Sequence, residues 1–216
     1  MSGRLPGPER KRQILAVARQ VLARNGYHET TMSEIAKAAG VTKPVLYQHY
    51  RSKRDLYRSV LEDIGARLEA AVIGAAVETE SPRQRAEAGI QAYAEFVEQD
   101  QDGFQLLFTG VNRQDPEWAA LTSSVERSLA SAIASLIDVP SIAPVRRQTM
   151  AYGVIGLAEA MMRFAKSSEA GEYPTDRLSA DITSLLWAGL RGIDGETADG
   201  AERGDDLGPA LDKSIP

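Results

Sequence analysis

The chain has 216 residues, of which 43% are hydrophobic and 25% charged, with a formal net charge of −5 and no cysteine. This composition is that of a globular protein with a buried core, and it excludes disulfides and thiolate metal sites. No apolar run approaches the ~20 residues of a membrane span, and the polar N-terminus lacks the apolar region of a secretory signal. We therefore expect a soluble, cytoplasmic protein that does not enter a membrane.

The charges are divided unevenly along the chain. Residues 1–60 hold twelve Lys and Arg against four Asp and Glu, a net charge of +8, whereas the remaining residues hold thirteen against twenty-six, a net of −13. A basic head on an acidic body predicts a polyanionic partner for the head alone. A solvated charged surface is the simpler alternative.

Helix signals begin after an N-terminal arm, residues 1–8. Residues 9–25 carry one apolar helical stripe that Gly26 closes, formed by Ile14, Val17, Ala18, Val21 and Leu22. Thr31 and Glu34 have the spacing of a capping box, which predicts a short helix over residues 33–39 that Gly40 ends. Thr42 then caps a third helix over residues 43–50, with Pro44 tolerated in its first turn.

The rest of the chain continues as helices. Ser52 begins a long one over residues 53–78, and later helices begin at Ser81-Pro82, Asp115-Pro116, Pro144 and Pro174-Thr175. Strand-like alternation is nearly absent. We predict an all-α protein of about nine helices: a helix-turn-helix domain over residues 9–56 and a helical bundle over residues 57–193. The acidic, glycine-rich residues 194–216 are predicted to be disordered.

Two short helices around a glycine turn form a helix-turn-helix, whose second helix would enter the DNA major groove. The stretch TTMSEIAKAAGVTKPVLYQHYRSKRDLY also resembles the DNA-binding region of TetR-family transcriptional regulators. That resemblance implies a homodimer that binds a palindromic DNA operator, usually as a repressor released by a small-molecule effector. It assigns base reading to Lys43, Pro44, Val45 and Gln48. It assigns phosphate contacts to Thr31, Thr42, Tyr47, His49 and Lys53.

Each assignment has a plainer alternative. His49 is the kind of polar helix residue that is usually only solvated, and Tyr47 would also suit a half-buried core position. Arg51 and Arg54 are interpreted as surface or nonspecific charges. An enzyme is disfavoured because no His or Cys follows residue 60, and no phosphate loop or metal-ligand spacing occurs. We expect no metal or cofactor; a helical adaptor that binds only protein remains an alternative.

The body is predicted to hold a ligand pocket and a dimer interface. The pocket is assigned to large side chains, with the plain core as the alternative for most of them: Tyr93, Phe96, Phe104, Phe108, Trp118, Tyr152 and Met161. The interface is assigned to apolar stripes of the last two helices, with packing inside one subunit as the alternative. Its residues are Val154, Leu157, Met161, Leu178, Ile182, Leu185, Leu186 and Gly189.

Two polar groups of the body are interpreted separately. The acidic residues Glu98, Asp100 and Asp102 are taken as a solvated helix end. Asn112 and Arg113 are candidates for polar contacts with a ligand, although a solvated loop is the favoured reading.

Overall fold

The computed structural model describes residues 7–108, 115–137, 142–167, 169 and 171–193. These ranges contain nine α-helices and no strand, which confirms the all-α prediction. The helices are α1 (Gly7–Glu29), α2 (Met32–Ala38), α3 (Lys43–His49), α4 (Lys53–Val77), α5 (Pro82–Gln99), α6 (Gln101–Phe108), α7 (Pro116–Leu136), α8 (Pro144–Ala165) and α9 (Thr175–Ile193). The predicted tail and the residues Asn112 and Arg113 lie outside the described residues.

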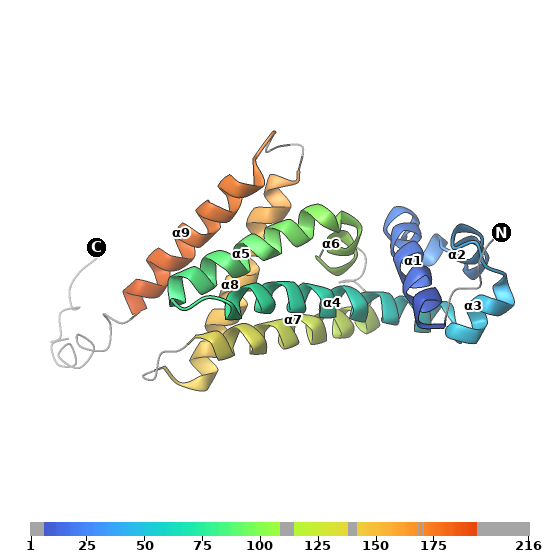
Figure 1. The fold of residues 1–216 in the computed structure, drawn as a ribbon, viewed down its shortest axis with the longest axis horizontal. Helices are drawn as coiled ribbons and strands as arrows, with labels where there is room; N and C mark the ends of the chain where they lie inside the picture. The colour runs from blue at the N-terminus through green and yellow to red at the C-terminus, as the bar shows by residue number, and fades with distance from the viewer. Residues whose placement is uncertain (1–6, 109–114, 138–141, 168, 170, 194–216) are drawn as a thin grey trace, which may run out of the picture.

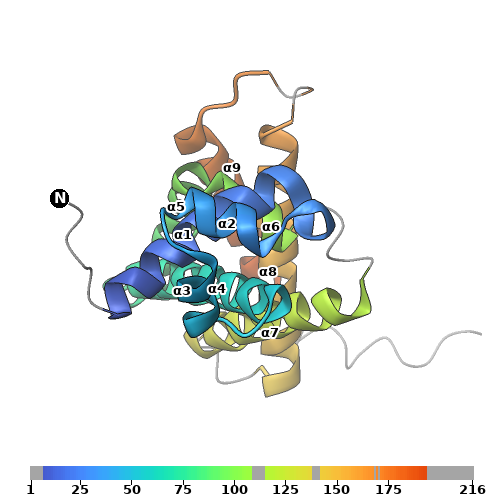
Figure 2. The same ribbon diagram turned by 90° about the vertical axis from the view of Figure 1, so that its right-hand side faces the viewer.

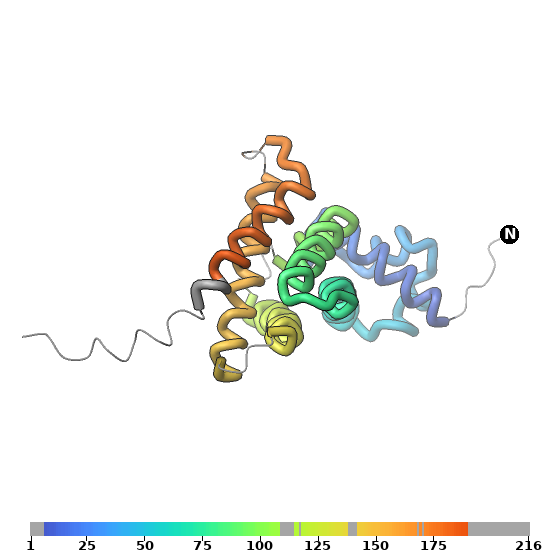
Figure 3. The backbone as a smooth tube through the Cα atoms, turned by 60° about the vertical axis from the view of Figure 1, so that its left-hand side comes forward, coloured from blue at the N-terminus to red at the C-terminus, as the bar shows by residue number. Residues whose placement is uncertain are grey.

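The molecule is elongated, with the short helices at one end (Figure 1). Helices α1–α3 form this head, and α4 runs from it into the body between α5 and α7. Helices α8 and α9 lie at the far end, where α9 packs on α5 and α8 packs on α7 (Figure 3). Figure 2 looks along the molecule from the head and shows the other helices behind it. Helix α4 therefore connects the far end to the head.

Local signals account for most helix ends. The side chains of Thr31, Ser52 and Ser81 each accept a hydrogen bond from the backbone three residues on, as N-caps should. Thr42 is the N-cap of α3 as predicted, but its side chain makes no capping bond. Gly26 interrupts α1 with a φ of 78°, and one further turn then reaches Glu29.

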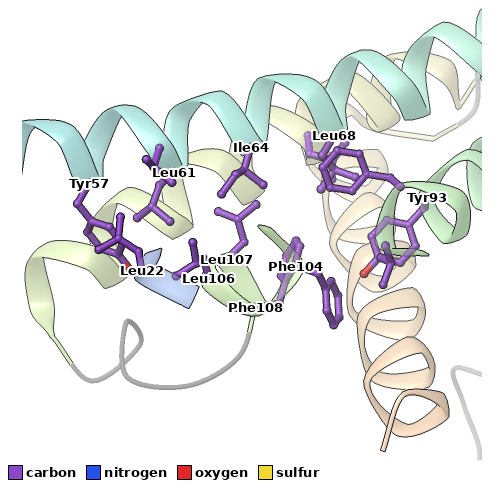
Figure 4. Close-up of a cluster of buried hydrophobic side chains, with 14 of the residues drawn as sticks. Leu22, Tyr57, Leu61, Ile64, Leu68, Tyr93, Phe104, Leu106, Leu107 and Phe108 are labelled. Atoms are coloured by element: carbon purple, nitrogen blue, oxygen red, sulfur yellow. The ribbon is translucent and has the colours of Figure 1, made fainter. Parts of the chain in front are cut away.

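The core follows one face of α4. Figure 4 shows Leu61 and Ile64 of this helix directed toward side chains of α6, Tyr57 beside Leu22 of α1, and Tyr93 of α5 at the other end of the cluster near Leu68. Burying each such side chain contributes about 1.5–3 kcal/mol. Helix α7 closes the other side of α4 at Gly65, where an added Cβ would lie 2.6 Å from the Val125 side chain. Among the described residues, no helix has the length and apolar character needed to cross a bilayer.

Candidate nucleic-acid interface and effector cavity

The start of α2 is fixed by a reciprocal pair of polar contacts. The Glu34 backbone N–H donates to Thr31 Oγ1 at 3.2 Å, and the Thr31 backbone N–H donates to Glu34 Oε2 at 2.7 Å. The Glu34 carboxylate accepts hydrogen bonds from the Thr31 backbone N–H and from the Thr31 hydroxyl. Both bonds lower the pKa of Glu34, and the backbone bond has the larger effect. The predicted capping box is therefore confirmed.

The turn between α2 and α3 sets the angle of the second helix. Gly40 has a φ of 65°, which suits glycine, and the Val41 N–H returns to the Ala36 carbonyl at 3.0 Å. Ile35 of α2 and Leu46 of α3 are both fully buried and lock the two helices together. At the end of α3 the Tyr50 ring lies in the core, and burial raises the pKa of its hydroxyl.

The opposite face of α3 is open to solvent. The assigned contact residues that are exposed are Thr31, Thr42, Lys43, Pro44, Tyr47 and Gln48, whereas Val45, His49 and Lys53 are half-buried. Tyr47 is 43% exposed, which argues against a core position for its ring. The Lys43 ammonium lies 6.0 Å from the centre of that ring. These side chains form a polar, aromatic surface at the tip of the molecule.

Lys53 has a structural role that the sequence did not reveal. Its Nζ donates to the carbonyls of Tyr27, His28 and Thr30 at 2.7, 3.1 and 2.8 Å. An ammonium has three donors, so these bonds use them all. Lys53 thereby joins the start of α4 to the end of α1, where helix carbonyls lack intrahelical partners. A phosphate contact would have to replace or share one of these bonds.

Aromatic rings fasten the head to the body. The Trp118 ring of α7 lies 4.6 Å from Tyr57 of α4 and 5.0 Å from Tyr27 of α1, measured between centroids. Trp118 is only 2% exposed and packs at the head end of α4. Trp118 does not line the cavity described below, because its ring is packed at the junction of three helices.

A buried carboxylate also holds this junction. Asp100 lies between α5 and α6 and is 5% exposed; its Oδ2 is 2.6 Å from both Arg19 of α1 and Arg67 of α4. The Gly103 N–H donates to Asp100 Oδ1 at 2.8 Å. The prediction of a solvated acidic helix end is wrong for Asp100, because its partners lie 81 and 33 residues away in sequence and no local pattern reveals them.

A cavity of about 400 Å³ lies at the other end of α4. Helices α4, α5, α7, α8 and α9 and residue Ile142 line it, and the lining side chains are apolar except for Arg85, Tyr93 and the indole of Trp187. Of the residues assigned to a pocket, only Tyr93 lines this cavity. Phe96, Phe104 and Phe108 are core, Met161 is half-buried, and Tyr152 is 41% exposed on the outer face of α8. The size of these aromatic residues predicted that most of them would be buried, but it did not predict which of them would line the cavity.

The predicted dimer stripe divides into two faces. Leu178 and Ile182 are buried within this chain, and Val154 and Leu186 are half-buried and line the cavity. Leu157 and Met161 are half-buried. Leu185, at 56% exposure, and Gly189 remain on the outside, where Tyr152 and Phe164 of α8 are also exposed.

Comparisons with known proteins agree with this architecture. Residues 14–60 match the family model described as bacterial regulatory proteins, tetR family. Over 190 residues the chain is 35% identical to the HTH-type transcriptional activator FasR of Mycolicibacterium smegmatis, a match that covers 87% of this chain and 85% of that protein.

Solved structures extend the likeness to the whole fold. A TetR-like transcriptional regulator from Rhodococcus sp. RHA1 has a TM-score of 0.69 at 29% identity, covering 88% of this chain and 100% of that one. FadR from Bacillus subtilis, solved in complex with stearoyl-CoA, has a TM-score of 0.72 at 17% identity, covering 82% and 98%. These relatives are transcriptional regulators and not enzymes. The chain belongs to the tetR family of bacterial regulatory proteins and is a DNA-binding transcriptional regulator.

Proposed function

We propose that this regulator binds a palindromic operator as a cytoplasmic homodimer and is released from DNA by a small-molecule effector. The observation that carries the proposal is the position of the cavity, which lies against the far end of the helix that begins in the head. A ligand that favours one placement of α4 can change the population of the DNA-binding arrangement. No metal or resident cofactor is required.

The DNA contacts divide into two chemical classes. Gln48 is exposed on α3 and can pair with adenine, Lys43 can pair with guanine, and the apolar surfaces of Pro44 and Val45 can pack on thymine methyl groups. Thr31, Thr42, Tyr47 and His49 supply hydrogen-bond donors suited to phosphate oxygens. Lys53 remains among the residues assigned to phosphate contacts. Its ammonium already donates to carbonyls at the end of α1, and these bonds would compete with a contact to DNA.

The outer face of α8 and α9 supports self-association. Tyr152, Phe164, Leu185 and Gly189 are exposed there, and small residues would allow two copies of these helices to approach closely. A two-fold axis through this face would relate two copies of the chain. Their two heads would then lie together at the end of the dimer away from α8 and α9. We expect the recognition helices to lie about 34 Å apart, or somewhat more, to match successive major grooves.

The lining of the cavity favours an effector with a large apolar part. FadR from Bacillus subtilis binds stearoyl-CoA in its solved complex, which is an example of such a ligand in this fold. A volume of about 400 Å³ lies within the usual range for small-molecule sites. Filling it would add contacts between α4 and the α8–α9 pair, so a ligand would alter the packing of α4.

The effect on transcription has two candidates. Repression is the first, since the family resemblance implies a protein that occupies an operator until an effector removes it. Activation is the second, because FasR of Mycolicibacterium smegmatis, whose match covers 87% of this chain, is named a transcriptional activator. In vitro transcription from a promoter with the selected operator distinguishes them: added protein lowers transcript yield in the first case and raises it in the second.

The DNA-binding proposal is tested by selecting genomic fragments with the purified protein and then measuring variants on the selected site. Gln48→Ala should cost about 1–3 kcal/mol on the operator and relax preference at one position per half-site, with little change on scrambled DNA. Arg54→Ala, outside the recognition helix, serves as the matched control and should weaken binding to operator and scrambled DNA alike. Equal losses on both DNAs for Gln48→Ala would overturn the base-reading assignment.

The oligomeric proposal is tested by sedimentation of the full chain and of Leu185→Glu. The wild type should sediment as a dimer at micromolar concentration, and a charge at the centre of the exposed stripe should dissociate it. A monomeric wild type that still binds a palindromic site with full affinity would contradict the homodimer.

A further inference from the structure

Two arginines from different parts of the molecule share one carboxylate oxygen. Arg19 lies on α1 in the head and Arg67 lies near the middle of α4 in the body, and an Nη atom of each is 2.6 Å from Asp100 Oδ2. The Asp100 side chain is only 5% exposed, so water cannot replace either arginine at little cost. The head and the body therefore compete for the same buried acceptor.

The carboxylate itself is fixed at the corner between α5 and α6. The Asp100 backbone N–H donates to the Phe96 carbonyl at 2.9 Å, and the Asp100 carbonyl accepts from the Phe104 N–H at 3.0 Å. Asp100 Oδ1 accepts from the Gly103 N–H at 2.8 Å, and a Cβ added at Gly103 would lie 2.6 Å from Oδ2. A rearrangement at this site therefore involves the two arginines rather than the acid.

The two arginines differ, because only one of them has a second acceptor. Arg67 Nε donates to Asp63 Oδ2 at 3.0 Å, one turn earlier on α4, and the Arg67 guanidinium lies 5.5 Å from the centre of the Phe96 ring. Arg19 binds Asp100 through Nη1 alone, and its buried Nε has no hydrogen-bond partner among the described residues. A guanidinium binds a carboxylate best through two parallel bonds, so Arg19 is held in an incomplete geometry.

A second arrangement would complete the geometry of Arg19. If the middle of α4 moved away from the corner between α5 and α6, Arg67 would leave Asp100 but keep Asp63, which moves with it on the same helix. The carboxylate would then accept from both Nε and Nη1 of Arg19. One ionic bond is lost and one is gained, so the two arrangements are close in energy and a small bias selects either.

We propose that Asp100 is a two-position ionic switch that sets the placement of the head relative to the body. In one position Asp100 binds both arginines, as in the structure. In the other it binds Arg19 alone, and Arg67 pairs only with Asp63. Helix α6 packs on both α1 and α4 (Figure 1), so the exchange moves the head against this corner. The switch requires only the DNA-binding head of the family, and it is independent of the cavity and of effector release.

Three substitutions bias the switch. Arg67→Met leaves Asp100 to Arg19. Asp63→Asn removes the second acceptor of Arg67 and directs it to Asp100, and Arg19→Met has the same result because it removes the competing arginine. Arg67→Met and Asp63→Asn both break one pair of partly exposed side chains on α4, so a merely structural pair predicts equal effects. The switch predicts opposite effects.

Two spin labels report the placement of the head, because the chain has no cysteine of its own. One label is attached at Ala38→Cys of α2 and the other at Ser123→Cys of α7, both exposed positions. The labelled chain is mixed with excess unlabelled protein, so that only separations within one chain are measured. Arg67→Met and Asp63→Asn should shift these separations in opposite directions, and Arg19→Met should shift them as Asp63→Asn does.

Operator affinity is measured on the same substitutions without labels. Arg67→Met and Asp63→Asn should change this affinity in opposite senses, each by about fivefold or more, as expected for coupled sites. Arg83→Met, which breaks the equivalent pair with Glu87 on α5, is the control and should match the wild type in both measurements. Urea unfolding confirms that each variant is folded.

The two measurements test different parts of the proposal. Separations that shift in the same direction in Arg67→Met and Asp63→Asn, or that do not change in either, overturn the switch. Opposite shifts in separation with unchanged operator affinity contradict its control of DNA binding. Opposite changes in both measurements support the switch, whether or not any cavity ligand releases the protein from DNA.

Discussion

The two ends of α4 are built differently. At the head end, Tyr57 packs against Trp118 and Tyr27, and near the middle of the helix Asp100 holds Arg67 to Arg19 of α1. At the far end, Val72 faces a cavity of about 400 Å³. A densely packed joint moves as a unit, whereas a hollow region can be filled or emptied at modest cost. If the proposed function holds, a ligand acts at the far end and the head end transmits the movement.

The largest expected effect uses the two tryptophans, one at each end. Trp118→Ala removes a buried ring from the joint and should lower the free energy of unfolding by about 3–5 kcal/mol. Trp187→Ala removes a half-buried ring beside space that is already empty, and should cost roughly 1–2 kcal/mol. Urea unfolding at a fixed protein concentration measures both.

Ligand binding should show the opposite order. Trp187→Ala should change affinity for a cavity ligand, whereas Trp118→Ala should leave that affinity intact and weaken the response of DNA binding to the ligand. If the two variants lose equal stability and equal ligand affinity, the contrast between the two ends is wrong.

The ionic part of the joint comes second. Asp100→Asn keeps the shape of the side chain but removes the charge that Arg19 and Arg67 share. We expect a loss of about 2–3 kcal/mol, below the 3–5 typical of a fully buried pair, because Arg67 is 40% exposed and water screens it. Asp102→Asn, on the more exposed first turn of α6, is the control and should change stability by a few tenths. Similar losses in both variants would contradict a special role for Asp100.

Lys53 gives a smaller effect at the same end. Lys53→Met keeps the apolar stem and removes the three bonds to the α1 carbonyls, so it should cost about 2 kcal/mol of stability. Lys43→Met, on the exposed face of α3, should change stability by less than 0.5 kcal/mol.

Binding measured against salt concentration then separates the two uses of Lys53. A phosphate contact predicts that Lys53→Met reduces the salt slope by about one on operator and scrambled DNA alike. An unchanged slope with reduced stability assigns Lys53 to structure alone, and unchanged stability contradicts the bonds to α1.

These contrasts also explain what was predictable from the sequence. Features set by neighbouring residues, such as the capping box at Thr31 and the turn at Gly40, were predicted because their physical causes lie within a few positions. The all-α class followed from dense helix signals and the absence of strand alternation.

Features set by distant residues were missed or misplaced. Asp100 looked like one of several acidic residues at a helix end until α1 and α4 supplied its partners. Trp118 was assigned to a pocket because ring size predicts burial and says nothing about which helices meet there. Arg85 was not singled out, because only the three-dimensional structure shows that it lies beside an apolar cavity and that its Nε donates to the Thr79 carbonyl at 3.4 Å.

The smallest expected effect tests a purely local feature of the head. Glu34 is exposed, and its pKa is lowered by the bonds that it accepts from the Thr31 backbone and hydroxyl. A carboxyl with a lowered folded-state pKa stabilises the fold above its unfolded pKa of about 4.3, and this contribution is lost as pH falls through the folded value.

Glu34→Gln retains a capping oxygen without the charge, whereas Glu34→Ala retains neither. Between pH 5 and 8 the stability order should therefore be wild type, Glu34→Gln, Glu34→Ala, with constant differences. On acidification below pH 4 the wild type should approach Glu34→Gln, while Glu34→Gln and Glu34→Ala keep their separation. Thermal unfolding across this pH range measures the three proteins, and a gap between wild type and Glu34→Gln that does not change with pH would show that the charge of Glu34 contributes nothing to the cap.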